Sequence, residues 1–264
     1  MNDDLRGRSL LAVFAHPDDE SVACGGLLAW CADRGAAVSL LCVTHGEGGP
    51  GGGPSQPLRE TRAHELRAAA RILGISHLML LDHPDGMLPW VDPAVLEADI
   101  LSAIRRVRPD VVITFGEDGL YWHPDHVAIH ERTTAAVAAL GAMDGEAPAL
   151  YYVTMPPGSM RALVKNVQNT AAGQGLAGRS PHHILGVEDA DAFGALAAAP
   201  TLVVDASDFA TRKLAAIRCH RTQVADGALN LVAEGDAPRL LGIEHFRRAA
   251  VGSTADAFIE RFAK

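Results

Sequence analysis

Residues 9–20 read SLLAVFAHPDDE, an apolar run that stops abruptly at a cluster of ionisable residues. Its apolar part, 9–15, has the length and composition of a buried strand. Runs of the same kind recur along the first half of the chain, at 38–43, 77–81 and 110–115. Segments of helical period separate them, at 25–34, 59–73, 93–107 and 125–140. Strands that alternate with helices indicate βαβ units. We therefore expect an α/β fold, a Rossmann-like three-layer sandwich with a mostly parallel sheet.

The pattern weakens after residue 154. Residues 155–200 are rich in Gly, Ala and Pro and show no clear period. Beyond them, 201–204 again has the character of a strand, and 207–223 that of a helix with Ser207 at its N-cap.

Because no linker or internal repeat is evident, we expect a single domain over residues 1–264. In this interpretation 1–154 is the Rossmann-like half and 155–264 completes the pocket. The alanine-rich segment 161–199 fits either a cover over that pocket or an interface in a homo-oligomer.

Composition narrows the classes of function. The formal net charge is −9, and 48% of the residues are hydrophobic. An acidic chain is poorly suited to nucleic acid, whose binding proteins present a basic surface. No run approaches the ~20 apolar residues of a transmembrane helix, and we see no secretory signal. The four cysteines have no paired spacing. We therefore expect a cytoplasmic protein that acts on a small molecule.

Ionisable residues follow each predicted strand of the first half. These segments are HPDDE at 16–20, HGE at 45–47, HPDG at 83–86 and HPDH at 123–126. Because ligands of open α/β sheets bind beyond the carboxyl ends of the strands, we expect the site there. The chain contains neither GxGxxG nor GxxxxGK[ST], which argues against a dinucleotide or a nucleoside triphosphate as the ligand.

The spacing of these residues suits a catalytic metal. Zinc in such sites takes three ligands from His, Asp or Glu and leaves one position for water. His16 and Asp19, three residues apart, can converge on one ion, and His126 would complete the set. Asp18 would then be free to act as general base toward the bound water. The alternative for Asp18 is a plain N-cap of the following helix.

These residues also carry a family resemblance. HPDDE after the first strand and HPDH after the fourth resemble the two most specific motifs of the LmbE-like (PIG-L) deacetylase family. Supporting matches extend over most of the chain, at THGE 44–47, RAHE 62–65, Asp85-Gly86, and Lys213 with HRTQ 220–223. Two positions depart from the family pattern: Trp122 stands where glycine is usual, and His45 where aspartate is usual. Both departures concern the choice of substrate more than the chemistry.

The resemblance implies a role for each matching residue. His16, Asp19 and His126 would be the metal ligands, and Asp18 the general base. His123 would stabilise the transition state or protonate the leaving amine, and Tyr121 would polarise the acyl carbonyl. Arg62 and Asp85 would contact the substrate.

Each of the last two has a plainer interpretation. Arg62 is equally suited to a surface pair with Glu65. Asp85 before Gly86 also fits an ordinary turn, although its position at a strand end favours a functional role.

The expected activity is therefore removal of an N-acetyl group from a GlcNAc-type amino sugar. Zn²⁺ would be the metal, with Fe²⁺ as the alternative because His and carboxylate ligands suit both ions. An amidase of thiol-sugar conjugates, or a hydrolase for longer N-acyl groups, is the second interpretation. A non-catalytic sugar-binding protein ranks third, because base and ligands are all present.

Overall fold

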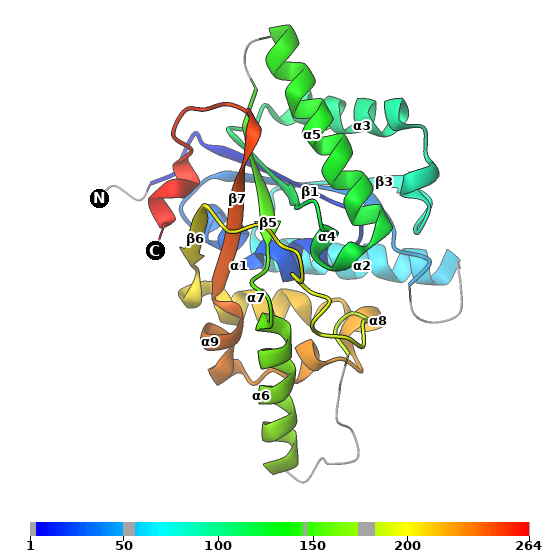
Figure 1. Cartoon of the computed structure of the whole chain (residues 1–264), viewed down its shortest axis with the longest axis vertical. Coiled ribbons are helices and arrows are strands. Elements are labelled where there is room, and N and C mark those ends of the chain that lie inside the picture. The colour runs from blue at the N-terminus through cyan, green and yellow to red at the C-terminus, as the bar shows by residue number, and fades with distance from the viewer. Residues whose placement is uncertain (1–3, 50–55, 145–146, 174–182, 264) are drawn as a thin grey trace.

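A single twisted sheet forms the centre of the molecule in the computed structural model, which describes residues 4–49, 56–144, 147–173 and 183–263. Its strands lie in the order β3-β2-β1-β4-β5-β7-β6 (Figure 1). Their bounds are β1 Ser9–Phe14, β2 Ala37–Thr44, β3 His77–His83, β4 Val111–Phe115, β5 Ala149–Thr154, β6 Leu202–Asp205 and β7 Ile243–Gly252. The first five strands are parallel, and β7 runs antiparallel to both of its neighbours. The expected mostly parallel α/β sheet is confirmed.

Helices cover both faces of this sheet. The α-helices are α1 Asp19–Asp33, α2 Gln56–Leu73, α3 Pro93–Val107, α4 Gly119–Trp122, α5 Pro124–Asp144, α6 Ser159–Gly173, α7 Ala210–Ile217, α8 Arg221–Val224 and α9 Ala237–Leu241. Short 3₁₀ helices add η1 Leu88–Trp90, η2 Ser207–Phe209, η3 Ala228–Leu231, η4 Glu234–Asp236 and η5 Phe258–Phe262. Helices α3 and α5 pack together on one face, and α1, α2 and α7 on the other (Figure 1). The central strands are therefore buried on both sides, which is why β1 and β4 are almost wholly apolar.

Helix α1 is broken in its middle, where Cys24 leaves the helical region with φ −147° and ψ 22°. Just beyond this break, the N–H groups of Gly26 and Leu27 both donate to the carboxylate of Glu244 on β7 at 2.8 Å. Lys213 of α7 donates to the same carboxylate at 2.7 Å. A side chain at Gly26 would meet the Ala206 side chain at 2.8 Å, so glycine is needed for this close approach.

The structure differs from the sequence-based expectation mainly in the second half. Strands β5 and β7 and helix α6 had no clear signal. The expected helix 207–223 is wrong as one unit, because the chain leaves helical geometry at His220, with ψ 55°, between α7 and α8. Ser207 is not its N-cap, since its hydroxyl donates to Asp205 instead.

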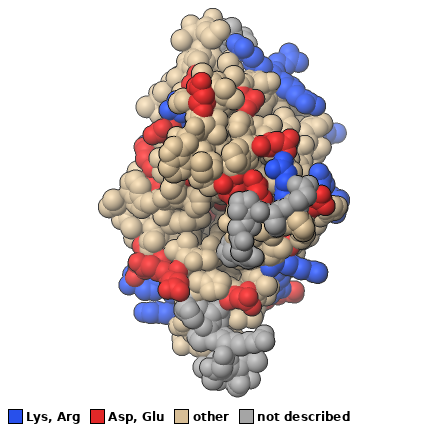
Figure 2. All heavy atoms as spheres, turned by 90° about the vertical axis from the view of Figure 1, so that its right-hand side faces the viewer, with Lys and Arg blue, Asp and Glu red and all other residues tan. Residues whose placement is uncertain are grey.

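In the described part of the chain, no helix combines the length and apolar character that crossing a membrane requires. Acidic side chains are scattered over the middle of the face shown in Figure 2, whereas most basic ones lie toward its edges.

Candidate active site

The expected site residues meet beyond the carboxyl ends of β1 and β4. These neighbouring strands mark the point where the strand order reverses, the usual ligand position in such sheets. His16, Asp18 and Asp19 follow β1 directly, and the segment 121–126 follows β4. A cavity of about 440 Å³ opens here, within the size range of small-molecule sites. It is lined by residues of both 1–154 and 155–264.

Three buried side chains converge at the floor of this site. The distance from His16 Nδ1 to His126 Nε2 is 3.1 Å. Asp19 faces both rings, with Oδ1 at 3.3 Å from His126 Nε2 and Oδ2 at 3.5 Å from His16 Nδ1. We call this group the His16–Asp19–His126 cluster.

The outer contacts of the two imidazoles determine where their hydrogens lie. His126 Nδ1 is 3.0 Å from the carbonyl of Gly119, so Nδ1 donates and Nε2 carries a lone pair. His16 Nε2 is 3.0 Å from Asp85 and 3.1 Å from Asp125, so Nε2 donates and Nδ1 faces the cluster. Hydrogen bonds of this kind are how proteins orient metal-binding histidines.

Two ring nitrogens and a carboxylate therefore face one another, an arrangement that requires a cation between them. Burial opposes protonation of His16, but hydrogen bonds from Asp125, Asp19 and Asp85 raise its pKa well above the usual value. Burial lowers the pKa of His126 to about 3, against the pull of Asp19. The distances of 3.1 Å between His16 Nδ1 and His126 Nε2 and of 3.3 Å between His126 Nε2 and Asp19 Oδ1 match two edges, about 3.3 Å each, of a tetrahedron with bonds of 2.0–2.1 Å. The residues thus fit a zinc-sized ion.

Two other groupings bring possible ligand atoms within 4.8 Å, His16 with His123 and His126, and His16 with Asp85 and Asp125. Three of these residues, His123, Asp125 and Asp85, already accept hydrogen bonds from backbone N–H groups. His123 Nδ1 accepts the N–H of Asp125 at 3.2 Å. The Asp125 carboxylate accepts the N–H groups of Gly86 and Leu88, and Asp85 accepts that of Gly48. We therefore assign these carboxylates to orienting His16 rather than to holding the ion.

Asp18 lies next to the cluster on a strained backbone, with φ 124° and ψ −29°. Its side chain makes no capping hydrogen bond, so the plain N-cap alternative is wrong. Burial raises the pKa of the Asp18 carboxyl to about 7, and Arg62 opposes this rise. A carboxyl with a pKa near 7 can both take up and release a proton at neutral pH.

Asp18 is held from two sides. Its backbone N–H donates to Glu20 Oε2 at 3.1 Å, and its carboxylate accepts from Arg62 Nη2 at 3.1 Å. Glu20 also accepts from the Ser21 hydroxyl at 2.5 Å and lies 3.0 Å from His220 Nε2. Glu20 belongs to the HPDDE segment but had no predicted role. His220 reaches it from the break between α7 and α8, and its other ring nitrogen has no partner among the described residues.

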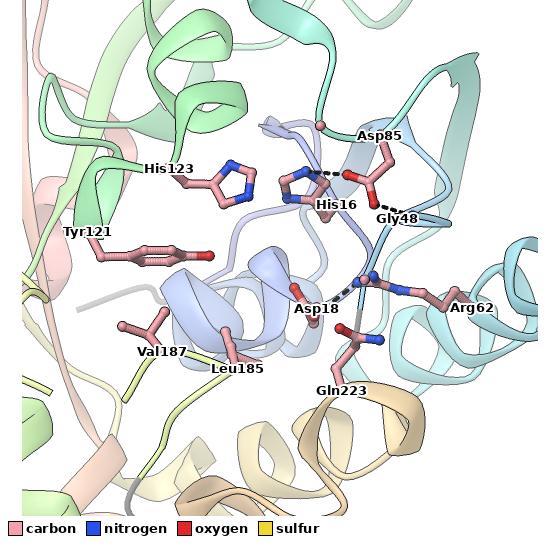
Figure 3. A pocket seen from close by; sticks show the side chains of 13 residues that line it. His16, Asp18, Gly48, Arg62, Asp85, Tyr121, His123, Leu185, Val187 and Gln223 are labelled. Atoms are coloured by element: carbon pink, nitrogen blue, oxygen red, sulfur yellow. Dashed lines mark hydrogen bonds and ion pairs between the residues drawn. The ribbon is translucent and has the colours of Figure 1, made fainter. Parts of the chain in front are cut away.

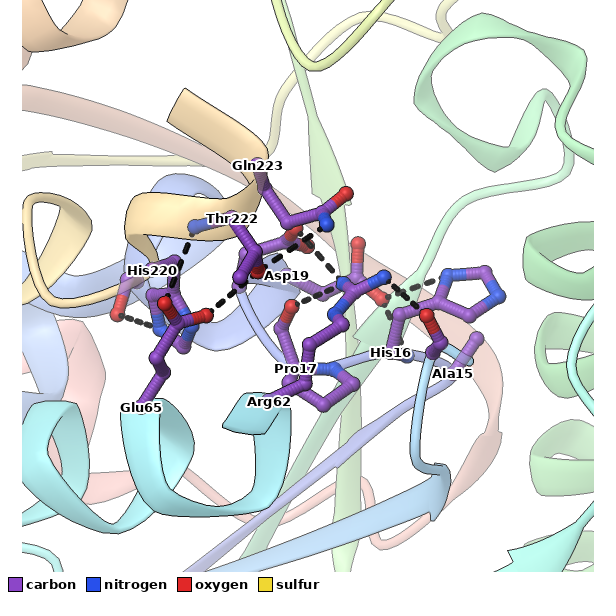
Figure 4. Close-up of polar contacts among 12 residues, drawn as sticks. Ala15, His16, Pro17, Asp19, Arg62, Glu65, His220, Thr222 and Gln223 are labelled. Carbon is purple, nitrogen blue, oxygen red and sulfur yellow. Dashed lines mark hydrogen bonds and ion pairs between the residues drawn. The ribbon is translucent and has the colours of Figure 1, made fainter. Parts of the chain in front are cut away.

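Arg62 and Asp85 both line the cavity, yet both are also bound to the protein. Arg62 donates to the carbonyls of Gly46 and Pro17, each at 2.6 Å. The surface-pair alternative with Glu65 is not what the structure shows, because Glu65 instead accepts from the backbone and hydroxyl of Thr222 (Figure 4). Burial raises the pKa of Asp85, but contacts with His16 outweigh this and lower it to about 2.

Tyr121 and His123 come from the irregular segment between β4 and α5. The Tyr121 hydroxyl points into the cavity, and His123 lies beside His16 with ring centroids 4.8 Å apart (Figure 3). Burial raises the pKa of Tyr121 above its usual value, so the phenol keeps its proton. Burial, reinforced by His16, lowers the pKa of His123. Trp122, where the family pattern has glycine, is 53% exposed and has φ 64°, a conformation that glycine adopts freely.

Several lining residues were not expected from the sequence. They are Leu185, Gly186, Val187 and Gln223. Gln223 belongs to the late HRTQ block, which was a usable signal, whereas 185–187 lie in the segment left unassigned. Gly48 and Gly49, from the glycine-rich segment that follows HGE 45–47, also line the cavity, and residues 50–53 of that segment fall outside the described residues.

Comparison with known proteins supplies the context for this geometry. Residues 11–137 match the family model described as PIG-L, GlcNAc-PI de-N-acetylase. A 1D-myo-inositol 2-acetamido-2-deoxy-alpha-D-glucopyranoside deacetylase of Kineococcus radiotolerans is 32% identical over 82% of this chain and 69% of its own length. A protein of the same name from Acidothermus cellulolyticus is 32% identical over 90% of this chain and 88% of its own.

Solved structures with a similar fold include an enzyme that catalyses a different reaction. The crystal structure of the 4-carboxy-2-hydroxymuconate hydratase GalB from Pseudomonas putida KT2440 has a TM-score of 0.64 at 20% identity. It matches 95% of this chain and 99% of its own. The fold alone therefore does not fix the reaction. The identity and coverage of the deacetylase relatives, by contrast, establish common descent, and the chain belongs to the PIG-L family.

Proposed function

We propose that the protein is a metal-dependent hydrolase that removes an N-acetyl group from a GlcNAc-type amino sugar. The observation that carries the proposal is the convergence of two imidazole nitrogens and the Asp19 carboxylate within 3.5 Å, beside Asp18 in an open cavity. The names of the relatives support the substrate class. Because the same fold also serves a hydratase, the proposal rests on these residues and relatives rather than on the fold.

His16, Asp19 and His126 would hold the ion, which we take to be Zn²⁺, with Fe²⁺ as the alternative. Such an ion supplies Lewis-acid polarisation of the acyl carbonyl and makes water more acidic. Asp85 and Asp125 keep His16 in the tautomer that binding requires, because both face its Nε2.

The protein's own groups carry the proton transfers. Asp18 takes the proton of the attacking water, since its carboxylate lines the cavity beside His16. The Tyr121 hydroxyl, which keeps its proton, donates a hydrogen bond to the acyl oxygen as negative charge develops there.

The leaving nitrogen needs a proton from either Asp18 or His123. We favour Asp18, because burial disfavours the charged form of His123. His123 then serves as a neutral donor through Nε2, since its Nδ1 accepts from Asp125.

Substrate contacts follow from the lining of the cavity. Arg62, Asp85 and Gln223 offer polar groups for sugar hydroxyls on one side. Residues from both 1–154 and 155–264 line the cavity, and on this basis we treat 1–264 as one domain.

The test is amine release from N-acetylated sugars by the zinc-loaded protein. The panel comprises free GlcNAc and its inositol-linked, malate-linked and oligomeric forms. We expect metal-dependent release from at least one member, and a fall on the order of 10²–10⁴-fold in Asp18→Ala and in the isosteric Asp18→Asn. Release that persists in both variants would remove Asp18 from the mechanism. Tight zinc binding without release from any member would contradict the acetyl-sugar assignment and favour longer acyl amides.

A further inference from the structure

A tight turn at residues 184–187 borders the cavity. Ile184 and Val187 exchange backbone hydrogen bonds at 3.0 and 2.9 Å, and the two residues between them have positive φ, 51° for Leu185 and 80° for Gly186. These features define a two-residue hairpin of type I′. The turn is anchored, because Ile184 is fully buried and the carbonyl of His183 accepts the N–H of Ala228 at 3.0 Å.

Leucine is an unusual residue for this turn. Type I′ turns prefer Asn, Asp or Gly at the first central position, because a bulky side chain is strained at positive φ. Leu185 is only partly buried, and its side chain lines the cavity together with that of Val187. Strained residues that persist at a cavity wall are candidates for a functional role.

The cavity has a polar and an apolar side. In Figure 3, Asp85, Arg62 and Gln223 stand on one side, Leu185 and Val187 lie below the ring of Tyr121 on the other, and Asp18 lies between them. An amide carbonyl that reacts at Asp18 must send its two substituents in opposite directions. With the sugar toward the polar side, the acyl carbon chain points at the turn.

We propose that the 184–187 turn is the acyl wall of the site. Leu185 and Val187 contact the methyl group of the acetyl substituent, and Leu185 limits how long an acyl chain can be. This inference rests on the proposed function and adds to it the feature that selects acetyl over longer acyl groups.

Leu185→Gly tests the wall without threatening the fold, since glycine adopts a φ of 51° freely. The measurement is kcat/KM for the N-acetyl and N-butyryl forms of one amino sugar. We expect the acetyl-to-butyryl ratio to fall by about tenfold or more, the usual effect of small differences in apolar pocket volume. Leu185→Asn, which also suits the turn, should slow both substrates without favouring butyryl. Glu188→Ala, at an exposed position beside the turn, serves as the control and should leave the ratio unchanged.

Three further outcomes separate this inference from the proposed function. If wild type releases amine but Leu185→Gly keeps its acyl preference, the acyl wall is wrong and the function stands. If the variant instead changes the preference among aglycones at constant acetyl, the turn faces the sugar side, which also overturns the inference. If wild type releases no amine from any acyl sugar, the proposed function itself fails.

Discussion

Two buried carboxylates in this protein, Glu244 and Asp19, are each 3% exposed but sit in opposite surroundings. Glu244 accepts from three donors, the N–H groups of Gly26 and Leu27 and the ammonium of Lys213. Asp19 accepts one backbone N–H, from His16, and otherwise faces two imidazole nitrogens whose hydrogens point elsewhere. The first group is satisfied within the chain, whereas the second requires an added cation.

This difference shows how a buried charge can be assigned a role. Burial of a carboxylate is costly in either case, so burial alone does not separate structure from function. The two cases differ in whether protein donors supply hydrogen bonds to the carboxylate oxygens. Glu244 with Lys213 stabilises the interrupted helix α1, whereas we propose that the His16–Asp19–His126 cluster holds an ion.

The largest effect is expected for His126→Ala. The variant removes one of three ligands, so zinc retained after dialysis should fall from one per chain to near zero. Loss of the ion should cost several kcal/mol of transition-state stabilisation, which is on the order of 10³-fold or more in kcat. Metal analysis and amine release on the same sample measure both. A variant that keeps its zinc would show that the ion lies elsewhere.

Lys213→Met, at the Glu244 carboxylate, should lower the stability of the fold and leave the proposed metal site unchanged. It leaves the Glu244 carboxylate buried without its cation, and such losses cost about 3–5 kcal/mol of unfolding free energy. Urea unfolding measures this change. Zinc content and kcat per folded molecule should stay at wild-type levels, because Lys213 does not line the cavity. A variant of normal stability with reduced zinc would reverse the assignment of the two groups.

The residues of the cluster could be predicted from the sequence, whereas most of the residues that contact them could not. His16, Asp18 and Asp19 could be placed because they follow a strand whose apolar run is unmistakable, and His126 because a second such strand precedes it. The contact of His220 with Glu20, and that of Glu244 with the N–H of Gly26, join residues about 200 positions apart, and no local pattern encodes such contacts. Strand β7 alternates between buried and half-exposed residues and includes polar ones, so its sequence does not have the apolar run that marks β1. The turn at Leu185 contradicts local preference, which is why sequence patterns could not find it.

Glu20→Gln tests a third buried carboxylate. Like Glu244, Glu20 has several hydrogen-bond partners, but one of them is the backbone N–H of Asp18. The amide cannot accept from Asp18, Ser21 and His220 together, so the strained backbone at Asp18 should lose part of its support. We expect kcat to fall roughly tenfold, equivalent to about 1.4 kcal/mol. Zinc content and KM should be unchanged. Equal losses of zinc and kcat would indicate that Glu20 shapes the metal site instead.

The smallest effect concerns the pH dependence of stability through His220. Burial lowers its pKa, but Glu20, and more weakly Asp18, outweigh burial and the opposing Arg62, so the pKa is raised. A raised pKa stabilises the folded state below the ordinary value of about 6.5, and this contribution is lost as pH rises through the shifted pKa. The difference in unfolding free energy between wild type and His220→Gln should therefore be larger at about pH 6 than at about pH 9. A constant difference would mean that His220 stays neutral throughout.

The central claim is that one ion completes the His16–Asp19–His126 cluster and is needed for hydrolysis. Zinc titration of chelator-treated protein tests it most directly, with bound zinc and amine release measured on the same samples. The account predicts that activity rises in proportion to zinc and levels off at one ion per chain, whereas His126→Ala neither binds zinc nor gains activity. Full activity in the metal-free protein, or saturation unchanged in His126→Ala, would contradict it.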